Sequence, residues 1–331
     1  EDNDRILAEF HFQSVVDDID ETEGAERSED RSEGDAAQGE LPFKREELAK
    51  AVISLKGGKA PGRDCVTNEL IKEVHKADPE WLLELYNACW RKSYFPNEWK
   101  AAEVVYFPKA DKDAAQAKSY RPICLLPALG KVLDKMLTNR LMIHIESTGK
   151  LSEAQFGFRR GRSTIHALKR VTEFIDASKR KGWYTGLVAL DVSNAFNSAR
   201  RADIIRCLGE FEVPSRLRRL IISFLLNRRI YLGKEEWKYN VGVPQGSCMG
   251  PVLWLLLINA ALKSQYGDNC FLQAFADDML LMVRFRKAYH MTDKVKIPLA
   301  DVLRWAEENS LTLNVDKFSD TRLSSNIWGY S

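Results

Sequence analysis

The segment FLQAFADDMLLMVR, residues 271–284, most constrains how this chain folds, because two adjacent aspartates interrupt an otherwise apolar stretch. Neighbouring carboxylates repel each other, and burying either of them without a partner is costly. The pattern predicts a strand, a tight turn that carries Asp277 and Asp278, and a second strand. Either this turn is simply solvated, as Asp-rich turns commonly are, or a cation occupies it.

A second apolar segment, GLVALDV at residues 186–192, also contains an aspartate near its end, Asp191. If the two strands are neighbours in one sheet, Asp191, Asp277 and Asp278 converge at the same edge. Carboxylate oxygens suit Mg²⁺, which takes few protein carboxylates together with substrate phosphates. Two such ions would activate an attacking hydroxyl and stabilise a leaving oxygen. The constellation therefore points to phosphoryl transfer.

Helical and strand patterns mix along the chain without a regular strand–helix alternation, and this favours an α+β fold over a doubly wound sheet. One further strand is expected at residues 103–109, where Pro108 stops it. Helices are expected at about residues 67–77, 79–92, 163–181, 200–208, 214–227 and 251–263. The length of 331 residues suits two or three lobes.

Charge is distributed unevenly along the chain. Residues 17–40 hold eleven acidic and two basic residues and no aromatic residue, so we expect a disordered acidic linker after a short helix at residues 1–16. Residues 41–331 hold 46 basic and 32 acidic residues. A body of this charge either has an ordinary solvated surface or binds a polyanion.

The remaining composition excludes several classes of protein. The six cysteines form no CxxC pair, which argues against a zinc site or a disulfide framework and fits a reducing compartment. The longest apolar run, residues 251–262, is too short to cross a bilayer, and no signal peptide is visible. We therefore expect a nuclear or cytoplasmic protein that is neither secreted nor bound to a membrane.

Six motifs occur in order: YRPICLLPALGKVLDK, QFGFRRGRST, LVALDVSNAFNSA, GVPQGSCMGPVLW, FADDMLLMV and WAEENSLTLNVDK. Over about residues 41–318 the chain closely resembles the reverse transcriptase of non-LTR (LINE-type) retrotransposons, particularly those of arthropods. The resemblance implies a right-hand polymerase with helical fingers at 41–182 and an antiparallel-sheet palm at 183–318, with a fingers insertion at about 200–240. No thumb is recognisable, and residues 319–331 are expected to be a frayed or truncated tail.

The implied activity is RNA-directed DNA polymerisation, in which a primer 3′-hydroxyl attacks the α-phosphate of a dNTP with the help of two Mg²⁺ ions, Mn²⁺ being an alternative. The implied partners are an RNA template with a DNA primer and dNTPs, while endonuclease or thumb segments would lie elsewhere in a parent polyprotein. By this resemblance Asp191, Asp277 and Asp278 are the catalytic metal ligands. Phe196, five residues after Asp191, matches the steric gate that excludes a ribose 2′-hydroxyl; ordinary core packing is the alternative.

Other positions match nucleotide- and template-binding residues of the family. Gln245 and Gly246 match the loop under the incoming nucleotide, although the same residues also form an ordinary turn. The remaining matches are all cations, for which a solvated surface is the alternative. They are Lys109 and Arg121 at the triphosphate, Arg159, Arg160 and Arg162 at template phosphates, and Lys317 as a general acid for the leaving pyrophosphate.

The chain also departs from the family pattern. KAPGRDCV carries Arg63 and Cys65 where the family usually has Pro and Gly, and Leu255 and Asn259 replace the usual Asn and Asp. Phe318 follows the motif lysine in place of Thr. An inactive nucleic-acid-binding remnant therefore remains an alternative. A metal-dependent nuclease or cyclase is a third, but such enzymes need neither VPQGS nor a bulky residue five positions after the first aspartate.

Overall fold

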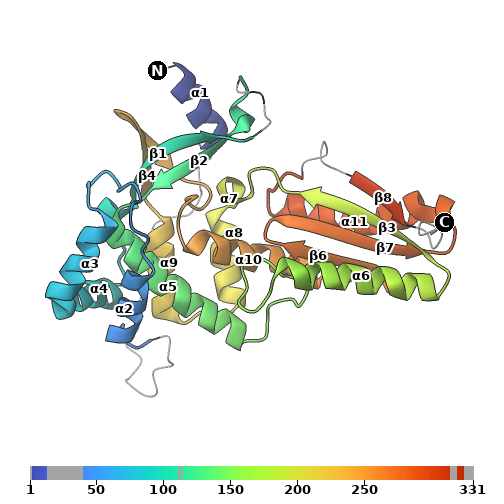
Figure 1. Ribbon diagram of the computed structural model, residues 1–331, viewed down its shortest axis with the longest axis horizontal. Coiled ribbons are helices and arrows are strands. Elements are labelled where there is room, and N and C mark those ends of the chain that lie inside the picture. The colour runs from blue at the N-terminus through green and yellow to red at the C-terminus, as the bar shows by residue number, and fades with distance from the viewer. Residues whose placement is uncertain (1, 13–39, 111–112, 114, 314–318, 324–331) are drawn as a thin grey trace. The chain divides into compact units, whose positions relative to one another are not determined.

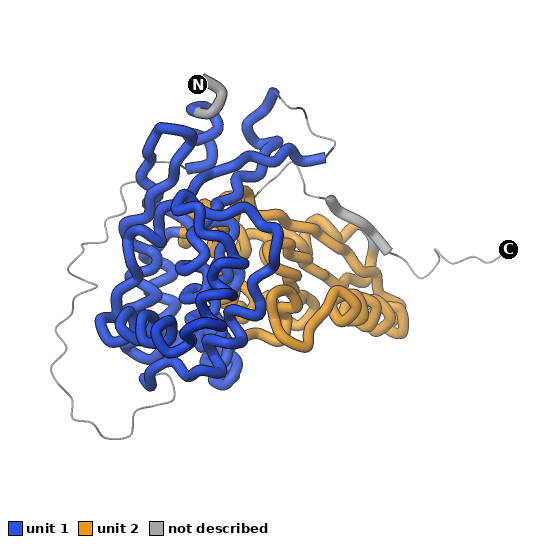
Figure 2. The backbone as a smooth tube through the Cα atoms, turned by 60° about the vertical axis from the view of Figure 1, so that its left-hand side comes forward, with its two compact units in different colours: residues 1–149, 200–252 blue, residues 150–199, 253–331 orange. Residues whose placement is uncertain are grey.

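The computed structural model describes residues 2–12, 40–110, 113, 115–313 and 319–323. The chain forms two compact units, which Figure 2 draws in different colours. Unit 1 consists of residues 1–149 and 200–252, and unit 2 consists of residues 150–199 and 253–331. Each unit is thus built from two separate stretches of the chain.

Unit 1 combines a group of helices with a four-stranded sheet of order β2-β1-β4-β5. Its neighbouring strands are antiparallel except for β1 and β4, which are parallel. The strands are β1 (Ala101–Pro108), β2 (Tyr120–Leu125), β4 (Arg228–Leu232) and β5 (Glu235–Tyr239). The helices are α1 (Asp2–His11), α2 (Arg45–Ile53), α3 (Asn68–Ala77), α4 (Pro79–Lys92), α5 (Ala128–Ser147), α8 (Arg201–Glu210) and α9 (Ser215–Leu225), with short 3₁₀ turns η2 (Asn97–Lys100) and η3 (Ala117–Ser119).

Helix α5 contributes a broad apolar face to the core of unit 1. Val132, Leu133, Met136, Leu137 and Leu141 are all completely buried. Their spacing places them on one broad face of the helix, which α2, α3 and α9 contact. The apolar periodicity of the segment therefore accounts for its position in the core.

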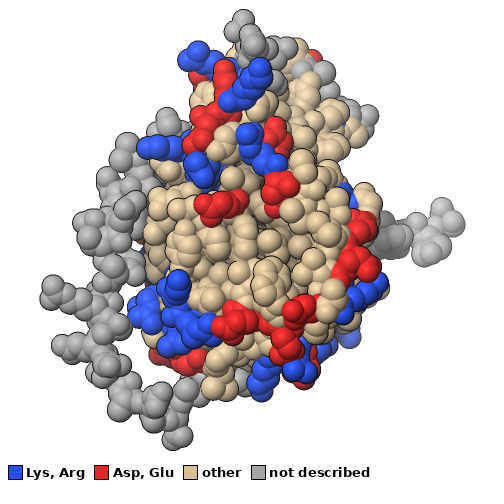
Figure 3. Space-filling view, turned by 90° about the vertical axis from the view of Figure 1, so that its left-hand side faces the viewer, with Lys and Arg blue, Asp and Glu red and all other residues tan. Residues whose placement is uncertain are grey.

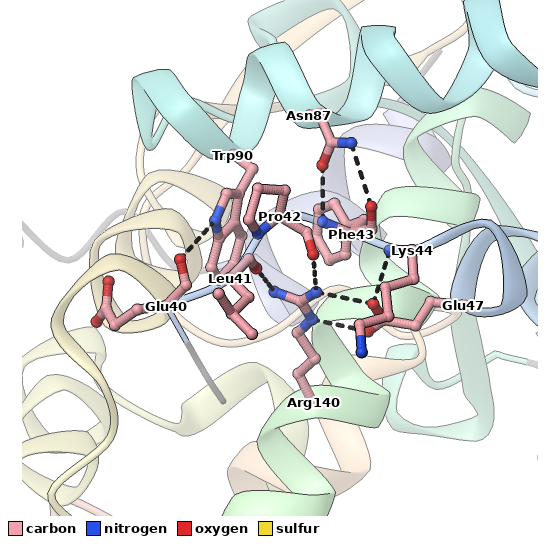
Figure 4. Close-up of polar contacts among 9 residues, drawn as sticks. All are labelled: Glu40, Leu41, Pro42, Phe43, Lys44, Glu47, Asn87, Trp90 and Arg140. Carbon is pink, nitrogen blue, oxygen red and sulfur yellow. Dashed lines mark hydrogen bonds and ion pairs between the residues drawn. The ribbon is translucent and has the colours of Figure 1, made fainter. Parts of the chain in front are cut away.

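Arg140 on α5 fixes the segment that leads into α2 (Figure 4). Its guanidinium donates to the carbonyls of Leu41 at 2.5 Å and Pro42 at 2.8 Å, and it binds the two carboxylate oxygens of Glu47 at 2.7 and 2.8 Å. The ring of Phe43 lies 4.3 Å from it. Although burial raises the pKa of Glu47, the hydrogen bond from Arg140 holds this pKa below its usual value. One buried fork of donors thus anchors the start of the helical part.

Unit 2 is built around a second sheet, of order β6-β7-β3-β8, in which all neighbours are antiparallel. Its strands are β3 (Tyr184–Asp191), β6 (Cys270–Phe275), β7 (Asp278–Phe285) and β8 (Ser319–Leu323). Its helices are α6 (Thr164–Arg180), α7 (Ala195–Ser198) and α11 (Met291–Glu308), with the short turn η4 (Ala288–His290). Helix α10 (Met249–Lys263) begins in unit 1 and continues into unit 2.

The two faces of this sheet differ in how completely they are covered. Val188 and Leu190 on β3 and Leu281 on β7 face the fully buried side, where Gly186 lies against the side chain of Met291 on α11. The alternate residues face α6, which runs along β6, β7 and β3 (Figure 1). At the end of this second face Asp278 stays exposed. Because side chains alternate between the two faces of a strand, Asp191 and Asp278 lie on the less covered side.

The mixed α+β architecture confirms the predicted fold class. The expected tail is wrong in part, because residues 319–323 form the strand β8, which pairs with β3; residues 324–331 lie outside the described residues. The expected boundary at residue 182 also differs from the structure. Helix α6 packs on the sheet of unit 2, so residues 150–182 belong with that sheet, whereas residues 200–252 belong to unit 1.

The ends of the chain bear on two more expectations. The N-terminal helix spans Asp2–His11, and the expected acidic linker lies almost wholly outside the described residues. The hairpin of β4 and β5 was not expected from the sequence, because its strands are short and rich in charged residues. No helix within the described ranges has the length and apolar character that crossing a lipid bilayer requires.

Candidate functional site

Two aspartates face each other at the end of the sheet of unit 2. Asp191 is the last residue of β3, Asp278 is the first residue of β7, and the two are register partners. Side chains of directly opposed residues lie on the same face of a sheet, and like charges in this position destabilise the pairing. Asp191 is half-buried and Asp278 is exposed. A cation between these carboxylates would offset their repulsion.

The third predicted carboxylate, Asp277, lies beside this pair in the turn. Phe275 pairs with Asp278, so Ala276 and Asp277 form a two-residue hairpin turn. Ala276 has a φ of 61°, the left-handed conformation that such tight turns use. Within the part of the chain that the structure describes, no three His, Cys, Asp or Glu side chains are grouped as a metal ion would need. The donor set suits Mg²⁺, which binds one or two protein carboxylates and completes its shell with substrate oxygens and water.

The turn is held in place by residues from two other segments of unit 2. The side-chain oxygen of Gln155, which is 1% exposed, accepts the N–H groups of Gly157 at 2.8 Å and Ala276 at 3.3 Å. The indole N–H of Trp254 on α10 donates to the carbonyl of Ala276 at 3.2 Å. A Cβ atom on Gly157 would lie 2.0 Å from the nitrogen of Ala276. The turn therefore needs a glycine at this position and a buried amide beside it.

Sequence reasoning identified the motif QFGFRRGRST but missed the roles of Gln155, Gly157 and Trp254. The available signal was an apolar motif containing one glutamine and one glycine next to a basic loop. This segment pairs with β6 through the bond from Phe156 N to Ala274 O at 2.9 Å and the bond from Ala274 N to Ala154 O at 2.9 Å. Such pairing depends on tertiary contact, so the sequence pattern alone does not reveal it.

The three arginines of the basic loop have different environments. Arg159 turns inward: its side chain is 7% exposed and donates to the carbonyl of Ser152 at 2.8 Å. Arg162 pairs with Glu153 and lies over the ring of Phe156. Arg160 is exposed. The prediction that all three contact phosphates therefore needs correction for Arg159, whose guanidinium stabilises the loop itself.

The predicted gate residue, Phe196, lies in the short helix α7 that follows β3. It is half-buried, and its ring centroid lies 6.2 Å from that of Phe158 and 6.1 Å from that of Trp254. Trp254 in turn bonds the turn that carries Asp277. Phe196 thus belongs to an aromatic group that borders the carboxylates, an arrangement compatible with both a gate and a packing role.

An apolar hollow of about 520 Å³ adjoins the carboxylate pair, between α6 and the less covered face of the sheet. Leu168 and Val171 of α6 line one side of it, and Leu280 of β7 lines the other. Asp191 and Asp278 lie in its wall. Apolar surface next to two carboxylates suits a ligand that has an apolar face and a polar end.

The residues predicted to bind the nucleotide belong to unit 1. Arg121 lies on β2, exposed, opposite Phe107 of β1. Lys109 follows β1 and is half-buried, and its ammonium group donates to the carbonyl of Lys118 at 2.7 Å. Arg121 therefore presents its charge to solvent, whereas the ammonium group of Lys109 already donates one hydrogen bond to the main chain.

The predicted nucleotide loop is joined to the same strand as Arg121. The N–H of Cys124 on β2 donates to the carbonyl of Gln245 at 2.8 Å. Gly246 has a φ of 123°, and a Cβ atom on it would lie 2.8 Å from the carbonyl oxygen of Cys124. Only glycine fits a conformation and a contact of this kind. The loop and β2 therefore form one packed structure within unit 1.

The remaining expectations fall on other parts of the chain. Lys317 and Phe318 lie outside the described residues. Leu255 is buried in the core. Asn259 accepts the N–H of Ser152 at 2.7 Å and donates to the carbonyl of Lys150 at 3.1 Å. Both polar groups of this side chain, which departs from the family pattern, are therefore hydrogen-bonded.

Charge on the face drawn in Figure 3 is mixed. Lys and Arg alternate with Asp and Glu around a broad region of uncharged side chains. The excess of basic residues is therefore not gathered into one continuous band on this face.

The chain was compared with known proteins. The family described as reverse transcriptase (RNA-dependent DNA polymerase) matches residues 107–330. The chain is 33% identical over 276 residues to a putative 115 kDa protein in the type-1 retrotransposable element R1DM of Drosophila melanogaster, a match that covers 82% of this chain and 26% of that protein. It is 30% identical to the probable RNA-directed DNA polymerase from transposon X-element, covering 83% of this chain and 31% of the relative. It is 26% identical to the RNA-directed DNA polymerase from mobile element jockey, covering 85% and 32%. The last two relatives are also from Drosophila melanogaster, and the chain spans between 26% and 32% of the length of all three.

Proposed function

Because this chain belongs to the reverse transcriptase family, we propose that it is the RNA-directed DNA polymerase module of a LINE-type retrotransposon, extending a DNA primer on an RNA template. The opposed carboxylates of Asp191 and Asp278 carry this proposal. Unit 2 then corresponds to the palm and unit 1 to the fingers. The substrates are a primer 3′-hydroxyl and a dNTP.

The chain's own residues position the reaction. Asp191 and Asp278, with Asp277 beside them in the turn, would hold the divalent ions, Mg²⁺ in the first instance. Ions bound there would supply polarisation of the attacking hydroxyl and positive charge next to the phosphates. The protein mainly orients the reactants in a fixed electrostatic site, since phosphoryl transfer needs little else from it.

Each unit supplies further residues to the proposed function. Arg121 offsets charge on the dNTP phosphates, and Arg160 contacts template phosphates without reading sequence. Phe196 excludes a ribose 2′-hydroxyl by its bulk. Gln245 and Gly246 support the nucleotide from below.

Primer extension tests the proposal. The purified chain, an RNA template annealed to a DNA primer, dNTPs and Mg²⁺ are combined, and extended primer is measured. The double variant Asp277→Ala, Asp278→Ala should lose extension, whereas Asp293→Asn, an exposed acid on α11 of the same unit, should retain it. Extension that persists in the double variant would refute the site. Salt-sensitive nucleic-acid binding without extension by the wild type would instead indicate an inactive remnant.

A further inference from the structure

A buried carboxylate on α5 binds the end of the predicted nucleotide loop, whose start contacts β2. Asp134 on α5 is 1% exposed. One of its oxygens accepts the N–H of Cys248 at 2.7 Å, and the other accepts the N–H of Met249 at 3.1 Å. Cys248 ends the loop and Met249 begins α10. Both oxygens of Asp134 are therefore committed to the junction between the loop and the helix.

Polar and charged groups surround the buried carboxylate of Asp134. The hydroxyl of Thr138 lies 3.3 Å from the oxygen that Met249 uses. The buried guanidinium of Arg228 on β4 is the nearby opposite charge. Burial raises the pKa of Asp134 to about 6, while the N–H of Cys248, then Arg228, Thr138 and the N–H of Met249 act to lower it. Burying the carboxylate of Asp134 therefore costs free energy, and its hydrogen bonds to the loop offset most of this cost.

The loop is anchored at both ends within unit 1. Its start is fixed by the bond between Cys124 and Gln245 and by the close approach of Gly246 to β2. Its end is fixed by Asp134. Only three residues lie between Gln245 and Met249, so fixing both ends leaves the intervening backbone little freedom. Because β2 also carries Arg121, Asp134 stabilises the frame in which the predicted nucleotide contacts lie together.

We propose that Asp134 is a positioning residue for the incoming nucleotide: its carboxylate holds the loop at Gln245 and Gly246 in the conformation that supports the dNTP. This inference rests on the proposed function. A carboxylate accepts two N–H groups with its two oxygens, whereas an asparagine has one acceptor and would turn its NH₂ group toward the second N–H. Asp134→Asn should therefore release the loop while nearly preserving side-chain volume.

Hydrogen exchange of the loop tests the positioning independently of catalysis. Amide exchange of residues 240–250 is measured by mass spectrometry in the full chain. In Asp134→Asn this peptide should exchange about tenfold faster, since a hydrogen bond to a buried charge is lost. The matched control is Asp78→Asn, which removes an acidic N-cap of α4 in the same unit without touching the loop. Equal exchange of the loop in Asp134→Asn and wild type would overturn the proposal.

If Asp134→Asn does not fold, as judged by its thermal melt, Thr138→Val replaces it. That variant removes a hydroxyl that donates to the main-chain carbonyl of Asp134 at 2.7 Å and lies 3.3 Å from one oxygen of its carboxylate. We expect a smaller acceleration, about threefold, confined to the same peptide. No acceleration there would overturn the proposal in the same way.

Primer-extension kinetics then test the functional consequence. Asp134→Asn should raise the KM for dNTP about tenfold with a smaller change in kcat, because binding geometry and not the reacting group is altered. Asp78→Asn should leave both constants near wild type. A faster-exchanging loop with an unchanged KM would contradict the inference. Absence of extension by the wild type would refute the proposed function alone, and loop exchange would then decide whether Asp134 positions the loop.

Discussion

Asp191 and Asp278 are register partners on adjacent antiparallel strands, so their carboxylates share one end and one face of a sheet. Their mutual repulsion is a property of the fold that can be measured without any substrate. Asp278→Asn removes the repulsion and should raise the free energy of unfolding in EDTA by about 0.5 kcal/mol. The same variant should lose the increase in melting temperature that Mg²⁺ gives the wild type, since a ligand of the native state stabilises it.

Thermal melts with and without Mg²⁺ check this prediction, and Asp293→Asn serves as the control because its carboxylate is exposed and pairs with Lys296 on the surface. An equal Mg²⁺ response in Asp278→Asn and wild type would mean that the pair does not hold the ion.

Gly157→Ala tests the support of the turn. The added methyl group would approach the backbone of Ala276 to 2.0 Å, so the turn or the segment must move. We expect a loss of about 2 kcal/mol in unfolding free energy, typical of overpacking, together with a strong loss of primer extension. Gly209→Ala in α8 is the control, since its added methyl meets only ordinary contact at 3.7 Å. Urea unfolding that shows Gly157→Ala to be as stable as wild type would exclude the clash.

Phe196→Val tests sugar selection. A smaller side chain should admit the 2′-hydroxyl, and incorporation of ribonucleotides relative to deoxynucleotides should rise by about tenfold. Single-nucleotide incorporation with matched dNTP and rNTP gives the ratio. Phe271→Val, which shortens a half-buried ring on β6 of the same unit, should leave this ratio unchanged. Identical discrimination by Phe196→Val and wild type would assign Phe196 to packing.

Arg140→Lys tests the anchor of unit 1. Lysine keeps the charge but cannot serve two carbonyls and both oxygens of Glu47, so unfolding free energy should fall by about 2 kcal/mol. The pKa of Glu47 is lowered in the native state, so its contribution is present above its unfolded pKa and is lost as the pH falls through its folded pKa. As the pH falls, the free energy of unfolding should therefore decrease less steeply in the variant than in the wild type. Arg91→Lys, whose ion pair with Glu84 is exposed on both sides, should change little.

Asp134 should give a pH dependence of opposite sign. Its pKa is raised to about 6, so between pH 4 and 6 the native state binds more protons than the unfolded chain, and stability falls as the pH rises. The groups that face it are Arg228, Thr138 and the N–H groups of Cys248 and Met249. The difference in unfolding free energy between wild type and Asp134→Asn should shrink over this range. A difference that is constant from pH 4 to 6 would contradict the assignment.

The local patterns were sufficient to predict much of this protein. The two aspartates that interrupt the apolar stretch at residues 271–284 identified the hairpin, and the apolar run ending near Asp191 identified β3. Helix patterning predicted α3 and α4, and in the structure the side chains of Thr67 and Asp78 accept N–H groups of the first turns of these helices. These features depend on neighbours within a few residues, so sequence spacing carries them.

Long-range contacts decided the rest. That Asp191 opposes Asp278, that Gln155 and Gly157 clamp the turn, that Arg159 faces inward, and that Asp134 binds a loop 114 residues later all depend on register and packing between distant segments. Sequence spacing does not specify such distances, because a one-residue shift of register or a different packing face changes every one of these contacts. The sequence by itself thus determined the chemical groups and their local elements, and the tertiary structure determined which groups meet.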